Sequence, residues 1–154
     1  MKIGILGTGS VGEAIGTALA AKKHNVMMGS RTAGNEKSKK WVKKAGNLAS
    51  EGTFDDAVAY GDVIFLCLNG EHTLDVVKNC NAGSFTNKIV IDVTNPLDFT
   101  HGMPPRILEN FSRDTSLGEE VQKAIPAAYV VKTLNTINYN LIVDARKVNS
   151  GNHS

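Results

Sequence analysis

Six residues near the start of the chain have the spacing Gly-x-Gly-x-x-Gly, which suits the binding of a phosphate group. They are Gly7, Thr8, Gly9, Ser10, Val11 and Gly12. Gly7 permits a tight turn, Gly9 lets the backbone approach a pyrophosphate, and Gly12 lets the following helix pack closely on a sheet. The N-terminus of that helix offers unpaired N–H groups and a partial positive charge to the phosphates. Because these residues lie between an apolar segment and a helical pattern, they predict a dinucleotide site.

A second apolar segment ends at Ser30 and Arg31, where an NAD-binding protein carries an acidic residue. That acidic residue accepts hydrogen bonds from the ribose 2′-hydroxyl and repels a 2′-phosphate. Arg31 instead offers a planar set of donors that suits a phosphate or the face of adenine, and Ser30 offers a hydroxyl. Two charge-assisted hydrogen bonds of roughly 1.5–3 kcal/mol each favour NADP by about two to four orders of magnitude. Lys37 adds a third positive contact if its helix begins beside this loop.

Other interpretations of these residues stay open at the level of sequence. The glycines also fit a simple packing turn, Arg31 fits a solvated loop arginine, and Lys37 fits the solvated face of a lysine-rich helix. A methyltransferase also begins with a glycine-rich turn between a strand and a helix. It normally carries an acidic residue after the second strand to hold ribose hydroxyls, and this chain has none there.

Polar residues follow three further apolar segments, and we expect them at the nicotinamide end of the site. Leu68 and Asn69 follow the first segment, Asn95 and Pro96 the second, and Asn135 the third. Ligands of a parallel α/β sheet lie across the carboxyl ends of the strands, so these residues are candidates to contact the ribose and carboxamide. An Asn-Pro pair also ends a strand in an ordinary turn.

No catalytic acid or base can be named from the sequence. The Tyr-x-x-x-Lys pair of the short-chain dehydrogenases is absent, because none of the three tyrosines has a lysine four residues later. His72 follows the fourth predicted strand, near the expected nicotinamide end, where it is either a substrate contact or an ordinary residue in the first turn of a helix. The His, Cys, Asp and Glu residues show no metal-ligand spacing, so no metal site is predicted.

The pattern of elements predicts how these residues are positioned. Strands are expected at 2–6, 26–30, 48–49 (very short), 62–68, 88–93 and 129–134, and helices after the glycine turn and at 36–45, 55–60, 71–80 and 116–124. Residues 99–112 are predicted to form an irregular segment with one turn of helix. Alternating strands and helices build a parallel sheet, so we predict an α/β doubly wound fold with strand order 3-2-1-4-5-6.

Composition limits the class of protein. The chain has 154 residues, 42% of them hydrophobic and 21% charged, as expected for one globular domain. A net charge of +2 does not point to a nucleic-acid partner. No apolar run approaches the roughly 20 residues of a membrane helix. The two cysteines lie in unlike settings, which indicates reduced thiols in a cytoplasmic protein.

Four segments together give the chain a family resemblance. They are residues 7–12, 29–31, 92–97 (Asp-Val-Thr-Asn-Pro-Leu) and 131–136 (Val-Lys-Thr-Leu-Asn-Thr). In this order they resemble the NADP-dependent oxidoreductases typified by the reductase of the deazaflavin coenzyme F-420, and they are similar to the nucleotide domain of the membrane ferric reductases. The resemblance implies a Rossmann fold, NADPH bound at the glycine turn, and its 2′-phosphate held by Ser30 and Arg31. It also implies hydride exchange with a flavin-type or deazaflavin ring, a small-molecule redox acceptor.

The chain departs from the family pattern at two points. Leu134 stands where the family often has phenylalanine. Relatives also continue beyond the point at which this sequence ends, with elements that help to build the acceptor pocket and the dimer. We therefore expect residues 1–154 to be an NADP-binding domain without that C-terminal extension, and the resemblance allows a homodimer. The alternative function is a non-catalytic NADP-binding sensor or regulatory module.

Overall fold

Six parallel strands form the central sheet of the computed structural model, which describes residues 1–151. Their order is β3-β2-β1-β4-β5-β8, and this confirms the predicted order because β8 is the sixth strand of the sheet along the chain. The strands of this sheet are Lys2–Leu6 (β1), Asn25–Ser30 (β2), Ala49–Thr53 (β3), Val63–Leu66 (β4), Ile89–Asp92 (β5) and Tyr129–Lys132 (β8). The doubly wound fold predicted from the sequence is therefore confirmed.

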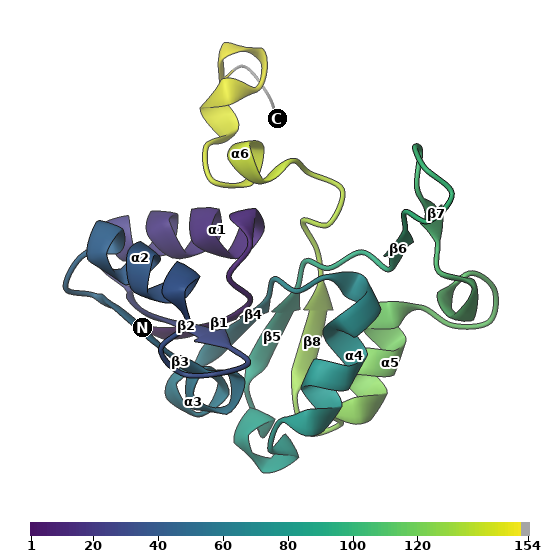
Figure 1. Cartoon of the computed structure of the whole chain (residues 1–154), viewed down its shortest axis with the longest axis horizontal. Coiled ribbons are helices and arrows are strands. Elements are labelled where there is room, and N and C mark those ends of the chain that lie inside the picture. The colour runs from purple at the N-terminus through teal and green to yellow at the C-terminus, as the bar shows by residue number, and fades with distance from the viewer. Residues whose placement is uncertain (152–154) are drawn as a thin grey trace.

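Helices cover both faces of this sheet (Figure 1). The α-helices are Ser10–Ala21 (α1), Glu36–Ala45 (α2), Phe54–Tyr60 (α3), Gly70–Asn79 (α4), Leu117–Ala124 (α5) and Tyr139–Ile142 (α6). Short 3-10 turns span Ala82–Phe85, Glu109–Phe111, Ala145–Lys147 and Asn149–Gly151. The predicted helix at 36–45 has the bounds of α2, and α5 begins with the capping box that Ser116 and Glu119 form.

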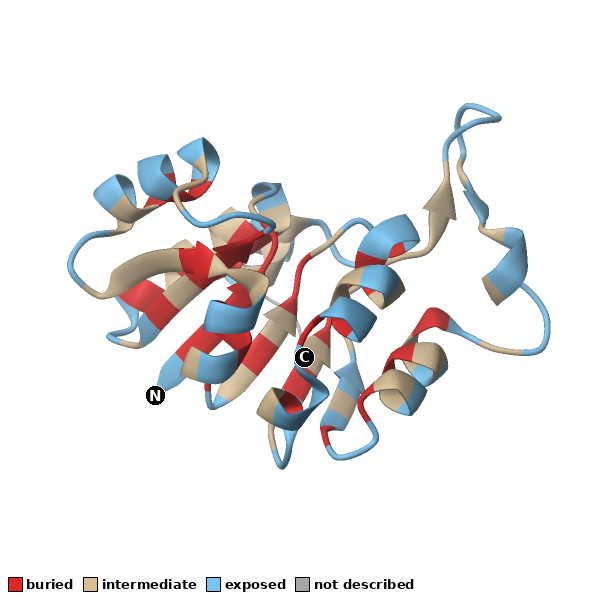
Figure 2. Cartoon of the chain, turned by 60° about the horizontal axis from the view of Figure 1, so that its bottom comes forward, coloured by how far each residue is buried: buried red, intermediate tan, exposed pale blue. Residues whose placement is uncertain are grey.

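Two apolar clusters hold the helices to the sheet. On one face, Ile15 of α1 and Trp41 of α2 pack with residues of β1 and β2. On the other face, Val77 of α4 and Val121 of α5 pack with residues of β4 and β5. Buried residues are therefore concentrated in the strands and on the inner sides of the helices (Figure 2). This packing fixes the carboxyl edge of the sheet, where the candidate site lies.

The third strand is longer than the sequence predicts. We expected a very short strand at 48–49, whereas β3 spans Ala49–Thr53. Its sequence, Ala-Ser-Glu-Gly-Thr, has no apolar run. The strand forms because it pairs in parallel with β2 along its whole length, from Val26 opposite Ala49 to Ser30 opposite Thr53. Pairing with a neighbouring strand has outweighed the weak local preference of these residues.

The segment expected to be irregular contains a small hairpin. Strand β6 (Leu97–Asp98) pairs antiparallel with β7 (Arg106–Ile107), and a short 3-10 turn follows at Glu109–Phe111. Figure 1 shows this hairpin projecting away from the central sheet. The strands are only two residues long, too short for a period-two pattern to be visible in the sequence.

None of the helices within residues 1–151 has the length and apolar character that are needed to cross a membrane.

Candidate functional site

The glycine turn between β1 and α1 has one tight side and one open side. Gly7 has φ +124°, and a Cβ there would lie 2.3 Å from the carbonyl oxygen of Cys67. A Cβ at Gly12 would lie 2.4 Å from the carbonyl oxygen of Gly7. At Gly9, in contrast, a Cβ would meet nothing within 4 Å. The absence of a side chain at Gly9 thus leaves open space above the turn, as a bound pyrophosphate requires.

The first turn of α1 has no side-chain cap. Asn35, Thr53, Asn69 and Ser116 each accept a hydrogen bond from the first turn of the helix that follows them. Gly9, at the start of α1, has no side chain to do this. The free N–H groups at this end of α1, together with the helix dipole, suit an anion.

Half of the predicted site residues line one hollow of about 320 Å³ at the carboxyl edge of the sheet. These are Gly7, Thr8, Gly9, Ser30, Arg31, Leu68 and Asn69. Asn35, Phe54, Cys67, His72 and Val76 complete its lining. The structure therefore brings together the glycine turn, the end of β2 and the segment after β4.

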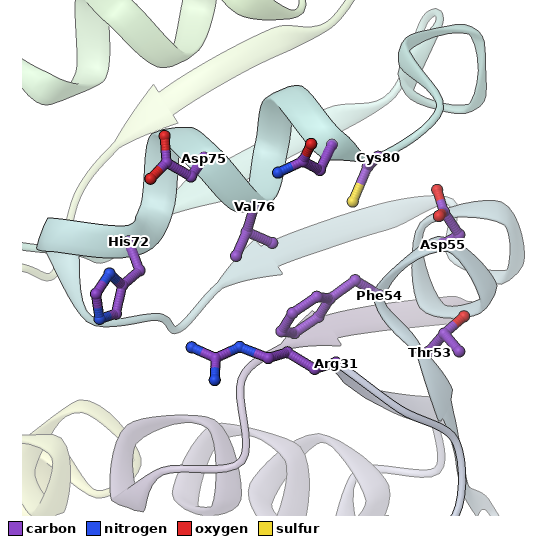
Figure 3. A pocket seen from close by; sticks show the side chains of 9 residues that line it. Arg31, Thr53, Phe54, Asp55, His72, Asp75, Val76 and Cys80 are labelled. Carbon is purple, nitrogen blue, oxygen red and sulfur yellow. The ribbon is translucent and has the colours of Figure 1, made fainter.

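An adjoining hollow of about 480 Å³ shares Arg31 with the first and is suited to a planar group. Arg31, Phe54, His72 and Val76 point toward one another around it, from the segment after β2 and from α3 and α4 (Figure 3). A guanidinium plane and an aromatic ring bind flat aromatic groups by stacking. No ion pair holds the Arg31 guanidinium within the described residues, so it is free to face a ligand. His72 lies beside Arg31, and it also lines the first hollow together with Leu68 and Asn69.

Phe54 and Val76 were missed by the sequence reasoning. Neither belongs to a recognised motif, and both are ordinary helix residues whose position depends on how α3 and α4 pack against the sheet. The one available signal was that α3 begins directly after β3, which places Phe54 at the same edge of the sheet as Ser30 and Arg31.

Glu51 organises the loop that follows Arg31, a role that no motif in the sequence predicts. Both of its carboxylate oxygens accept from the backbone N–H of Gly34, at 3.2 and 2.9 Å, and Oε2 lies 3.4 Å from the hydroxyl of Ser38. The negative charge of Glu51 is thus directed to the loop backbone. Ser30 also acts within the loop, because its buried hydroxyl donates to the carbonyl of Thr32 at 2.7 Å.

Lys37 lies on the other side of the glycine turn from Arg31. It belongs to the first turn of α2, and its backbone N–H is bound by the Asn35 side chain. Its side chain lines a separate hollow of about 450 Å³ together with Thr8, Gly9 and Lys40. Lys37 therefore faces the turn, as expected if the helix begins beside the loop, but it does not line the hollow that contains Arg31.

Asn95, Pro96 and Asn135 come together at the ends of β5 and β8. The Asn95 amide donates to the carbonyl of Asn135 at 2.5 Å, and the Asn135 amide donates to Asn95 Oδ1 at 2.9 Å. All three line a fourth hollow, of about 430 Å³, bounded by α5 and the β6–β7 hairpin. The predicted nicotinamide-end residues therefore split into two groups, with Leu68 and Asn69 in the first hollow and these three in another.

The two cysteines are free and buried. Burial, with a smaller effect of the Asp92 charge, raises the pKa of Cys67 to about 12, so the thiol beside the glycine turn is not a nucleophile at neutral pH. Among residues 1–151, no group of three or more His, Cys, Asp or Glu side chains is placed to hold a metal ion.

Comparison with known proteins agrees with this geometry. Residues 2–96 match the family described as NADP oxidoreductase coenzyme F420-dependent. The chain is 32% identical over 155 aligned positions to the F420-dependent NADP reductase of Methanocaldococcus jannaschii, with 94% of this chain and 67% of that protein covered. This chain belongs to the coenzyme F420-dependent NADP oxidoreductase family. It is accordingly an NADP-dependent oxidoreductase, as the sequence resemblance implied.

A second relative and two solved structures are also similar to this NADP-dependent oxidoreductase. A crystal structure from Arthrobacter sp. FB24, assigned as an F420-dependent NADP-reductase, superposes with a TM-score of 0.88 at 36% identity, over 99% of this chain and 70% of that one. The rat (Rattus norvegicus) metalloreductase STEAP3 is 29% identical over 137 residues, which are 89% of this chain but 25% of that protein. A reductive aminase of Aspergillus terreus, solved with NADPH, shares only the fold at 20% identity.

Proposed function

We propose that this chain binds NADP(H) across the carboxyl edge of its sheet and exchanges a hydride with a flavin-type or deazaflavin acceptor. The observation that carries the proposal is the continuous lining from the open, uncapped start of α1 at Gly9 to the free guanidinium of Arg31. In this proposal residues 1–154 act as one NADP-binding unit. Bound NADPH supplies the hydride chemistry, and the protein supplies binding, orientation and electrostatics.

The glycine turn binds the pyrophosphate in this proposal. The N–H groups of Ser10 and Val11, at the start of α1, face an anion that takes the open space above Gly9. Thr8 lines both hollows beside the turn, so its hydroxyl is available from either side. Gly7 and Gly12 act indirectly, because their missing side chains allow the strand, the turn and the helix to approach one another.

Arg31 marks the adenosine end, where selectivity for NADP arises. The guanidinium binds the 2′-phosphate or lies against the adenine, and Phe54, His72 and Val76 complete the surroundings of the base. The hydroxyl of Ser30 contributes by shaping the loop through its bond to Thr32, or by turning toward the phosphate when NADPH binds. Lys37 adds positive charge from the far side of the turn.

The nicotinamide end lies over the ends of β4, β5 and β8 in this proposal. The segments that carry Leu68, Asn69, Asn95 and Asn135 meet there, since the carboxyl ends of neighbouring parallel strands share one edge. The acceptor class comes from the family and from the named function of the Methanocaldococcus jannaschii relative. A cytoplasmic location is part of the proposal and is supported by the two free cysteines.

Oxidation of NADPH with a panel of acceptors tests this function. The purified protein is mixed with NADPH and a deazaflavin, a flavin or a ferric chelate, and the loss of absorbance at the nicotinamide band is followed. We expect turnover with the deazaflavin or the flavin and slower turnover with NADH. Tight NADPH binding without turnover on any acceptor would favour the sensor module. Turnover with the ferric chelate alone would replace the acceptor in the proposal.

A further inference from the structure

A buried carboxylate lies at the end of β5, three residues before Asn95. Asp92, the last residue of β5, is fully buried. Its Oδ1 accepts two hydrogen bonds from Thr94, one from the backbone N–H at 2.9 Å and one from the hydroxyl at 2.7 Å. Its Oδ2 makes no hydrogen bond within the described residues. A buried carboxylate whose second oxygen makes no hydrogen bond needs a positive charge nearby.

Lys132 supplies that charge. It is the last residue of β8 and the register partner of Asp92 in the parallel ladder, so both side chains lie on the same face of the sheet. The Nζ of Lys132 lies 3.1 Å from Asp92 Oδ2, and the lysine side chain is only 33% exposed. The same Nζ donates to the carbonyl oxygen of Thr94. One ion pair therefore binds Thr94 through its hydroxyl, its N–H and its carbonyl.

The segment that begins at Thr94 is held from two further sides. Asn95 exchanges hydrogen bonds with Asn135, as described above. On the side of α4, a Cβ at Gly70 would lie 2.0 Å from the carbonyl oxygen of Asn95, so the start of that helix packs directly on the segment. Residues 94–96 thus have little freedom to move, although they form no strand with the central sheet.

Stability alone is a poor explanation for such a pair. The desolvation of two charges largely offsets their attraction, and apolar residues of similar volume often stabilise a fold equally well. A buried pair at the ligand edge of a sheet is a candidate for a role at the site. We propose that Asp92 and Lys132 are positioning residues, which hold residues 94–96 in the conformation that the nicotinamide half of the cofactor requires.

This inference rests on the proposed function, and it makes a distinction between the two halves of the cofactor. In the proposed function the adenosine half lies at Arg31 and Phe54, which line two hollows whose lining includes neither Asp92 nor Lys132. Loss of the ion pair should therefore weaken the binding of the nicotinamide half and leave the adenosine half unchanged. A pair that served only the fold would affect both halves together.

The test compares NADPH with adenosine 2′,5′-bisphosphate, which carries adenine and a 2′-phosphate but no nicotinamide. Asp92→Asn, Lys132→Met and the double variant are titrated with both ligands, and their thermal unfolding is recorded. We expect each variant to lose about tenfold in NADPH affinity, the equivalent of about 1.4 kcal/mol. Affinity for adenosine 2′,5′-bisphosphate should match that of the unaltered protein.

The double variant keeps the test decisive even if a single variant fails to fold. It leaves no uncompensated buried charge, so we expect it to regain the thermal stability that the single variants lose. Its NADPH affinity should stay low, because the segment is still unsupported. Recovery of both stability and NADPH affinity in the double variant would overturn the inference and leave the pair a purely structural role.

Lys88→Met is the matched control. Lys88 also donates through its Nζ to backbone carbonyls, those of Val58 at 2.6 Å and Ala59 at 3.3 Å, but it lies just before β5, at the opposite end of that strand. We expect this variant to lose stability without any change in NADPH affinity. An equal loss of NADPH affinity in the control would also overturn the inference. Failure of the unaltered protein to bind either ligand would instead overturn the proposed function.

Discussion

Arg31 is exposed, lines two hollows and carries no carboxylate partner within the described residues. An arginine of this kind is available to bind a phosphate bidentately. Its loop is held by Glu51 from β3, whose carboxylate is occupied by the N–H of Gly34. The carboxylate of Glu51 therefore supports the backbone of the loop that follows Arg31.

Replacement of Arg31 tests selectivity for the 2′-phosphate. We expect Arg31→Ala to weaken NADPH binding by about 1.5–3 kcal/mol, the contribution of one charge-assisted hydrogen bond, and to change NADH binding little. Arg106→Ala, which removes an exposed arginine from the β6–β7 hairpin, is the charge-matched control and should change neither. Titration by intrinsic fluorescence gives both affinities. An equal loss for NADPH and NADH would assign Arg31 to adenine stacking or to the fold.

Replacement of Glu51 tests the role of the loop. Glu51→Gln keeps the size of the side chain but weakens its bond to Gly34, so we expect NADPH affinity to fall by about 1 kcal/mol. Simple charge considerations predict the opposite sign, because one negative charge near a phosphate is removed. Glu36→Gln, an exposed carboxylate in the first turn of α2, reports that simple charge effect. A gain in NADPH affinity for both variants would refute the supporting role of Glu51.

The turn between β1 and α1 contains two glycines with different roles, one in ligand binding and one in the packing of the fold. The backbone of Gly9 has φ −83° and ψ 178°, which any residue adopts, and a Cβ there meets no protein atom. Gly12 has no such space, because its Cβ would press on the carbonyl of Gly7. The two glycines of one motif therefore act through different physical effects.

Variants of these two glycines should behave in opposite ways. Gly9→Val should leave the unfolding temperature unchanged and weaken NADPH binding at least about tenfold, because the side chain enters the space of the pyrophosphate. Gly12→Ala should lower the free energy of unfolding by about 1–3 kcal/mol, the usual cost of overpacking. Thermal unfolding and NADPH titration are measured on both. Unchanged NADPH affinity in Gly9→Val would remove the glycine turn from the site.

The elements that the sequence predicted well are those with a strong local signal. The order of the six parallel strands follows from alternating apolar runs and helical patterns, and the start of α5 follows from its capping box. Strand β3 was underestimated because pairing with β2 creates it, and the β6–β7 hairpin was missed because its strands are too short to show a period. Such features depend on neighbours that are distant in sequence.

The candidate site was predictable to a similar degree. Gly7, Gly9, Ser30 and Arg31 lie in motifs at fixed distances from predicted strands, and the structure places these four residues in one hollow. Phe54 and Val76 became visible only when two helices were placed on the sheet. The pairing of Asp92 with Lys132 depends on the register of β5 against β8, which local sequence patterns do not reveal.

The two buried thiols affect the whole molecule, because they lower its free energy of unfolding at alkaline pH. Burial raises the pKa of Cys67 to about 12 and that of Cys80 to about 11, from an ordinary value of 9.0. Above pH 9.0 the unfolded chain loses thiol protons that the folded chain keeps. The folded state then binds more protons than the unfolded state, so the free energy of unfolding falls as pH rises through this window.

Removal of the thiols should make this decline less steep. Each thiol contributes up to about 1.4 kcal/mol per pH unit between its unfolded and folded pKa values. We expect the Cys67→Ala/Cys80→Ala variant to lose stability more slowly than the unaltered protein between pH 9 and 11, while lysine titration affects both equally. Urea unfolding at a series of pH values measures both slopes. Parallel slopes would show that the thiols ionise as readily in the folded protein as in the unfolded chain.

We propose that the whole carboxyl edge, from Gly9 to Arg31, is built for NADP. Equilibrium titration of the unaltered protein with NADPH and with NADH, under the same salt conditions, measures this selectivity. Two charge-assisted hydrogen bonds to the 2′-phosphate predict that NADPH binds at least about 100-fold more tightly than NADH. Equal affinities for the two nucleotides, or tighter binding of NADH, would show that this edge does not select for the 2′-phosphate.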